Sequence, residues 1–83
     1  MVMQSTEPIT LALARTLIAD GRARDIRRTH GLSLAEVAAG LGVSPAIVSA
    51  WERGERKPRR PNALAYAEIL AELVALDLDS GEA

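Results

Sequence analysis

The stretch that most constrains the fold is residues 32–58, where the sequence predicts two short helices separated by a tight turn. Ser33 is a suitable N-cap, and Glu36 follows it at the spacing of a capping box. Apolar residues then recur every three or four positions and mark one helical face: Leu34, Val37, Ala38 and Leu41. Gly40 and Gly42 give the backbone the freedom that a sharp turn requires, so the first helix should end near Leu41.

The second helix of the pair begins directly after this turn. Ser44 is a suitable N-cap, and Pro45 fits the first helical position. An apolar face continues until Gly54 and consists of Ile47, Val48 and Trp51. A helix, a short turn and a second helix form the motif that places its second helix in the major groove of DNA. We therefore expect a helix-turn-helix over about residues 33–53.

The net charge of −1 argues against binding to nucleic acid until the positions of the charges are considered. All ten Lys and Arg residues lie between Arg15 and Arg60, together with five acidic residues, which gives this span a charge of +5. Residues 61–83 hold five acidic residues and no basic one. The chain thus consists of a basic segment followed by an acidic one, and the basic segment suits a DNA-binding module.

Three segments in this order resemble the Cro- and phage-repressor-like helix-turn-helix family, often called XRE: GLSLAEVAAGLGVS, AIVSAWERG and ERKPR. The resemblance covers about residues 22–76. It implies an all-α, lambda-repressor-like DNA-binding domain, a compact bundle of four to five helices that binds operator DNA, usually as a dimer. The helix opened by Ser44 would be the recognition helix, and Arg27 would form an ion pair with Glu52, which closes that helix.

The positions of the recognition helix that would face the bases carry short side chains: Ser44, Pro45, Ala46, Ser49 and Ala50. None of these residues can form the bidentate hydrogen bonds that give strong base recognition. Serine hydroxyls and apolar contacts with thymine methyl groups remain available. We therefore expect modest direct readout, with specificity resting on DNA shape, bridging water or half-site spacing.

Contacts with phosphates are better provided for, because five basic residues follow closely on the recognition helix: Arg53, Arg56, Lys57, Arg59 and Arg60. The guanidinium group suits phosphate oxygens, so we expect these residues to contact the DNA backbone. Ser33, or the backbone N–H groups beside it at the start of the first helix, should add a further contact. The alternative interpretation of the basic run is a solvated surface without a ligand.

The rest of the chain predicts an extra N-terminal helix. Residues 8–20 and 21–30 should form helices that are broken at Asp20-Gly21, although a single bent helix is also possible. A last helix should run from about Pro61 or Asn62 to Leu76 and is more apolar than one small core requires. This surplus predicts a homodimer, with an interface made of Leu64, Tyr66, Ile69, Leu70, Leu73 and Leu76. A monomer with an apolar surface is the alternative.

We expect one domain over residues 8–76, a flexible segment over 1–7 and a disordered acidic tail over 77–83. The chain has no cysteine and one histidine, His30, so we expect no metal site, no cofactor and no enzymatic activity. No membrane span is apparent, which predicts a cytoplasmic protein. The favoured function is a sequence-specific transcriptional regulator, a small repressor or Cro-like switch protein, bound to a palindromic operator in double-stranded DNA. The alternative is an antitoxin or interaction module that binds a partner protein through its last helix.

Overall fold

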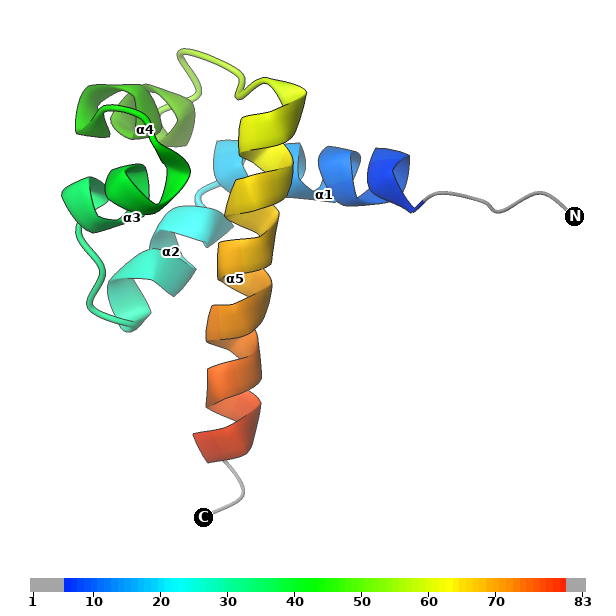
Figure 1. The fold of residues 1–83 in the computed structure, drawn as a ribbon, viewed down its shortest axis with the longest axis vertical. Coiled ribbons are helices and arrows are strands. Elements are labelled where there is room, and N and C mark those ends of the chain that lie inside the picture. Colours follow the sequence, from blue (N-terminus) through cyan, green and yellow to red (C-terminus); the bar gives the residue numbers. More distant parts are fainter. Residues whose placement is uncertain (1–5, 81–83) are drawn as a thin grey trace, which may run out of the picture.

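The computed structural model describes residues 6–80, and this part of the chain is built from helices (Figure 1). Its elements are α1 (Glu7–Ala19), α2 (Arg22–Thr29), α3 (Leu34–Leu41), α4 (Pro45–Glu52) and α5 (Arg60–Ser80). The all-α class, the five helices and the extra N-terminal helix all agree with the expectation from the sequence. No helix in residues 6–80 is by itself long and apolar enough to cross a membrane; only α3 and α4 counted together meet that test, across a sharp bend.

The long helix α5 is the spine of the molecule (Figure 1). Helix α1 crosses its first half and packs mainly against it, while α3 packs mainly against α4 on the other side of the spine. Helix α2 lies between these two parts and contacts both α1 and α5. The helix-turn-helix is thus held against α5, with α4 at the end of the molecule where α5 begins.

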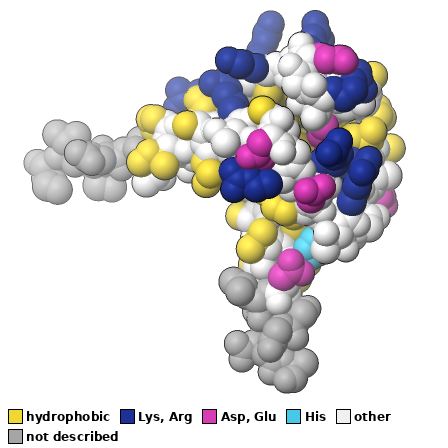
Figure 2. All heavy atoms as spheres, turned by 180° about the vertical axis from the view of Figure 1, so that it is seen from behind, with side chains coloured by type: hydrophobic (Ala, Val, Ile, Leu, Met, Phe, Trp, Pro, Cys, Tyr) yellow, Lys and Arg dark blue, Asp and Glu magenta, His cyan; other side chains and the backbone are white. Residues whose placement is uncertain are grey.

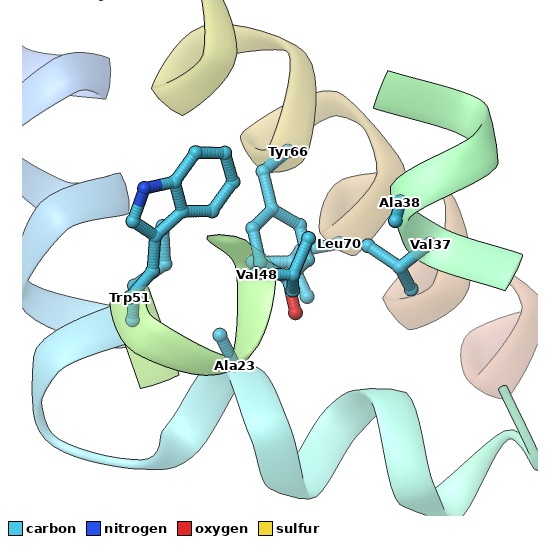
Figure 3. Packing of buried hydrophobic residues seen from close by; sticks show 8 residues of the cluster. Ala23, Val37, Ala38, Val48, Trp51, Tyr66 and Leu70 are labelled. Atoms are coloured by element: carbon cyan, nitrogen blue, oxygen red, sulfur yellow. The ribbon is translucent and has the colours of Figure 1, made fainter. Parts of the chain in front are cut away.

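One apolar core joins all five helices. Figure 3 shows residues from α3, α4 and α5 packed together on one side of α2, which adds Ala23. The buried members of the cluster are Ile18, Ala23, Val37, Ala38, Val48, Trp51, Tyr66 and Leu70. Trp51, which is 3% exposed, contributes its ring to this core, as its helical spacing predicted. The Tyr66 side chain is fully buried, so it belongs to the core of the monomer.

The chain breaks between α1 and α2 at the predicted position. Gly21 has a φ of +91°, in the left-handed region that other residues rarely adopt, and this ends the helical path. Gly21 is the N-cap of α2, and the carboxylate of Asp20 just before it accepts a hydrogen bond from the backbone N–H of Arg22, the first residue of α2, at 3.0 Å. Of the two possibilities left open by the sequence, two helices are therefore correct.

Helix α5 is longer than expected, and this corrects the predicted tail. Asp77 to Ser80 continue the helix, because neither proline nor glycine interrupts it before Gly81. Asp77 also contacts α2, with 3.2 Å between its Oδ2 and the Nε2 of His30. Residues 1–5 and 81–83, which the sequence analysis assigned to flexible ends, lie outside the described residues.

Candidate nucleic-acid interface

Both helices of the helix-turn-helix are capped as the sequence predicts. The Ser33 hydroxyl accepts the Glu36 N–H at 3.0 Å, and the Glu36 carboxylate accepts the Ser33 N–H at 2.8 Å, which completes a capping box. The Ser44 hydroxyl accepts the Ile47 N–H at 3.3 Å at the start of α4. Gly42, with a φ of +72°, turns the chain between the helices. The resulting bend between α3 and α4 is 108°, within the range typical of helix-turn-helix motifs.

The starting end of α4 is exposed, as a recognition helix requires. Ser44, Pro45 and Ala46 lie at the surface, and Ser49 is half-buried one turn later. The opposite face of α4 packs into the core. These four base-facing candidates therefore share one accessible stripe of the helix.

The assignment of Ala50 to the base-facing set was wrong. Ala50 is 9% exposed, so little of it is accessible to a base edge. Its carbonyl oxygen accepts hydrogen bonds from the N–H groups of Glu55 at 2.9 Å and Arg56 at 3.3 Å. The turn that leads out of the helix is thus tied to the backbone of Ala50.

The ion pair implied by the resemblance is present and buried. The Nε of Arg27 donates to the Oε2 of Glu52 at 2.8 Å, and its Nη2 donates to Oε1 at 2.9 Å. The remaining terminal nitrogen of Arg27 donates to the Leu32 carbonyl at 2.9 Å. Both charged side chains are only 5–6% exposed. The pair ties the last turn of α4 to α2 and to the loop that precedes α3.

Tyr66 adds a third member to this pair, which the sequence did not predict. Its hydroxyl donates to the Oε2 of Glu52 at 3.1 Å. Burial, with the nearby Glu52 carboxylate as a second cause, raises the pKa of the Tyr66 hydroxyl above its ordinary value, so Tyr66 stays a donor. The hydrogen bond to Glu52 likewise raises the pKa of Arg27. The end of α4 is thus held by both α2 and α5.

We call residues 53–59 the basic loop. Arg56, Lys57 and Arg59 are exposed there and line an open cleft of about 450 Å³, whose other walls are Val43, Ile47, Trp51 and Asn62. Within residues 6–80 none of these three basic residues forms an ion pair. Figure 2 shows Lys and Arg side chains gathered over the end of the molecule that carries this loop. The positive charge therefore lies beside the exposed part of α4.

The two other basic residues predicted to contact phosphate form ion pairs within the protein. Arg60 pairs with Glu7 at the start of α1. Arg53 donates to both carboxylate oxygens of Glu55, at 2.9 Å and 2.8 Å, and also to the hydroxyl of Ser49. This pairing lowers the pKa of Glu55 and raises that of Arg53. These arginines thus differ from the three unpaired basic residues of the loop.

A contact that the sequence analysis missed ties α1 to the basic loop. The Nε and Nη2 atoms of Arg15 donate to the carbonyl oxygen of Pro58 at 3.3 Å and 3.1 Å. Arg15 is the one charged residue between Glu7 and Asp20, in a run whose other residues are apolar or threonine. The single arginine in this run could have indicated the contact, because a half-buried guanidinium requires a hydrogen-bond acceptor.

The predicted dimer interface needs correction at two positions. Tyr66 is fully buried and Leu70 is 3% exposed, so both belong to the core of the monomer, and Leu70 reaches the surface only at the floor of an apolar groove. Leu64, Ile69 and Leu73 are half-buried, and Leu76 is 54% exposed. The periodicity of the helix explains the error. It shows that α5 carries more apolar residues than one face can hold, but it does not show which of them the other helices of the same monomer bury.

The exposed apolar surface lies instead on α1 and on the second half of α5. The large hydrophobic residues exposed there are Ile9, Leu13, Val74 and Leu76. Beside them is a groove of about 370 Å³ between α1, α2 and α5, lined by apolar residues and Thr10. Figure 2 shows hydrophobic side chains exposed along α1.

The described residues contain no group of three or more His, Asp or Glu side chains that could hold a metal ion. A family model described as helix-turn-helix (HTH_3) matches residues 24–72, more than half of the chain. Comparison with curated proteins gave no match, and comparison with solved structures gave none either. The matched segment contains the capped pair of helices, the buried Arg27–Glu52 pair and the basic loop. The chain therefore belongs to the Cro/C1-type helix-turn-helix (XRE) family.

Proposed function

We propose that this protein is a sequence-specific transcriptional regulator, a small repressor or Cro-like switch protein. Its family is one of DNA-binding regulators rather than of enzymes. The observation that carries the proposal is the exposed start of α4 beside three unpaired basic residues, Arg56, Lys57 and Arg59. In a complex, α4 would lie in the major groove and the basic loop would lie on the phosphates.

Within this arrangement Ser44, Pro45, Ala46 and Ser49 would face base edges. Phosphate contacts would come from the three unpaired residues of the basic loop, with Ser33 at the exposed start of α3 as a further contact. Arg60 can contribute only if it exchanges its bond to Glu7 for one to DNA. Three phosphate contacts per subunit predict that log affinity falls with log salt at a slope of about −3.

The test is a selection of bound duplexes from a random pool, followed by titration of the selected duplex at several salt concentrations. Replacing Arg56 and Arg59 together with alanine should weaken binding to all sequences alike and reduce the salt slope by about 2. Arg28→Ala is the matched control, because Arg28 is an exposed arginine on α2 rather than in the basic loop. If the wild-type protein selects no sequence, the proposed function is wrong.

We further propose a homodimer that binds a palindromic operator. The support is the apolar surface of α1 and α5, where Leu13 is 54% and Val74 42% exposed beside the groove. Leu13→Glu should convert a dimeric mass in solution to a monomeric one while the helix content stays the same. Ala39→Glu, at an exposed position of α3 outside this surface, is the control.

The same apolar surface favours a second candidate, an antitoxin or interaction module that binds a partner protein there. The two candidates differ in measurable ways. A monomer that selects no DNA sequence, and that binds a partner which Leu13→Glu releases, would favour the second candidate. A dimer that enriches a palindrome would favour the first.

A further inference from the structure

Within Pro45–Glu52 the exposed stripe of α4 carries no side chain that can form two hydrogen bonds with one base, but the next residue, Arg53, can. Arg53 follows Ser49 by four residues and Ala46 by seven, so it lies on the same face, one and two turns later. It is the C-cap of α4 and keeps a helical backbone, with its N–H bonded to the Ser49 carbonyl at 3.0 Å. Arg53 is therefore part of the base-facing stripe.

The guanidinium of Arg53 is turned back along α4. One terminal nitrogen, Nη1, donates to the hydroxyl of Ser49, a full turn closer to the start of the helix. The Nε and Nη2 atoms donate to the two carboxylate oxygens of Glu55. The side chain thus lies over the middle of the recognition helix, although it is 54% exposed.

Glu55 is itself held in place by the backbone. Its N–H donates to the Ala50 carbonyl at 2.9 Å, and the N–H of Gly54 donates to the Trp51 carbonyl at 3.0 Å. Gly54 has a φ of +75°, which turns the chain back toward α4. The backbone of Glu55 is therefore anchored to the helix that carries Arg53, and its carboxylate orients the guanidinium through two hydrogen bonds.

The contacts within residues 6–80 use three of the five N–H donors of Arg53. One N–H remains on Nη1 and one on Nη2. Two donors on neighbouring nitrogens are what a bidentate contact with the O6 and N7 atoms of guanine requires. A phosphate is the poorer acceptor here, because the Glu55 carboxylate on the same guanidinium repels a second anion.

We propose that Arg53 reads a guanine in the major groove and that Glu55 is the positioning residue that orients it. This inference rests on the proposed DNA-binding function and supplies the base contact that the helix itself lacks. It assigns Arg53 to base recognition instead of the phosphate contact expected from the sequence. The basic loop then divides into an orienting pair, Arg53 and Glu55, and the three phosphate-binding residues that follow.

The experiment measures affinity for the duplex selected from the random pool and for variants in which each base pair is replaced in turn. For Arg53→Ala, discrimination at one G·C pair should fall by about 5- to 150-fold while discrimination elsewhere is retained. Arg53→Lys should lose the same preference yet keep its affinity for mismatched DNA, because it keeps the charge without the planar fork. Arg56→Ala is the matched control and should weaken all duplexes equally.

Glu55→Gln separates the orienting effect of the Glu55 carboxylate on Arg53 from the repulsion between that carboxylate and the DNA. Loss of the carboxylate should raise affinity for mismatched DNA and lower discrimination at the same G·C pair, so the two quantities move in opposite directions. If Glu55→Gln raises affinity for every duplex by one factor, and Arg53→Ala lowers it by one factor, Arg53 is a phosphate contact and the inference is wrong while the proposed function stands. Failure of the wild type to select any sequence would overturn both.

Discussion

The buried pair of Arg27 and Glu52 offers the strongest test of how this small domain holds its recognition helix. Three hydrogen bonds from the Arg27 guanidinium end on Glu52 and on the Leu32 carbonyl, and both charged side chains are 5–6% exposed. Replacing Arg27 with methionine keeps the apolar stem but leaves the Glu52 carboxylate buried with the Tyr66 hydroxyl as its remaining donor.

The cost of this change is large for a chain of 83 residues. Removing one partner of a buried ion pair costs about 3–5 kcal/mol, and a single core of this size supplies about the same amount. A loss of about 3 kcal/mol corresponds to a fall in the melting temperature of about 12–24 °C. Arg27→Met should therefore retain little of the stability of the wild type, and its melting temperature should fall by at least about this amount.

Trp51 provides the measurement. It is the single tryptophan, is 3% exposed and adjoins Glu52 in sequence, so its fluorescence reports unfolding of the core in urea or on heating. The double variant Arg27→Met/Glu52→Met completes a thermodynamic cycle. Because it removes both charges, it should be more stable than Arg27→Met alone, although the Tyr66 hydroxyl then lacks its acceptor.

Arg22→Met is the control, since Arg22 belongs to the same helix and pairs with Asp20, but the two side chains are 59% and 40% exposed. It should leave the unfolding midpoint nearly unchanged. Burial of an unpaired charge is refuted if Arg27→Met lowers the free energy of unfolding by less than about 1 kcal/mol. It is also refuted if the losses caused by Arg27→Met and Glu52→Met singly add up to the loss in the double variant.

Three further predictions concern single contacts. Tyr66→Phe should cost about 1–3 kcal/mol in urea unfolding, because Glu52 loses a donor. Hydrogen bonds from Ser33 lower the pKa of Glu36, so the stabilisation by the Glu36 carboxylate is present at neutral pH and is lost as the pH falls through that lowered value. Glu36→Gln should therefore lose less stability than the wild type when both are titrated with acid and unfolding is followed by circular dichroism. Arg15→Met should weaken DNA binding several-fold in anisotropy titrations with little change in the unfolding midpoint, because it frees the basic loop.

Local signals allowed the helix-turn-helix to be predicted nearly to the residue. Ser33 and Ser44 bond to N–H groups three residues later, and Gly42 turns the chain through its own backbone angles. Each of these effects can therefore be predicted from neighbouring residues alone. The break at Gly21 is local in the same way. Features of this kind need no knowledge of the distant parts of the chain.

Positions that depend on distant packing were predicted less well. The sequence shows that α5 carries more apolar residues than one face can hold, but Tyr66 and Leu70 are buried by helices far away in the chain. Ala50 is 9% exposed, and the spacing of residues along the helix does not show that burial. In each case the helix was predicted correctly and its exposed face was not, because burial is set by tertiary contacts.

Helix α1 shows why the matched family segment alone does not describe this molecule. The match begins at residue 24, after α1 has ended, yet α1 bonds to the basic loop through Arg15 and to the start of α5 through Glu7. The other side of the same helix exposes Ile9 and Leu13 beside the apolar groove. A single added helix therefore touches both the proposed DNA surface and the proposed dimer surface. Arg15→Met and Leu13→Glu act on opposite sides of it, so comparing their effects on DNA affinity and on mass separates the two contributions of α1.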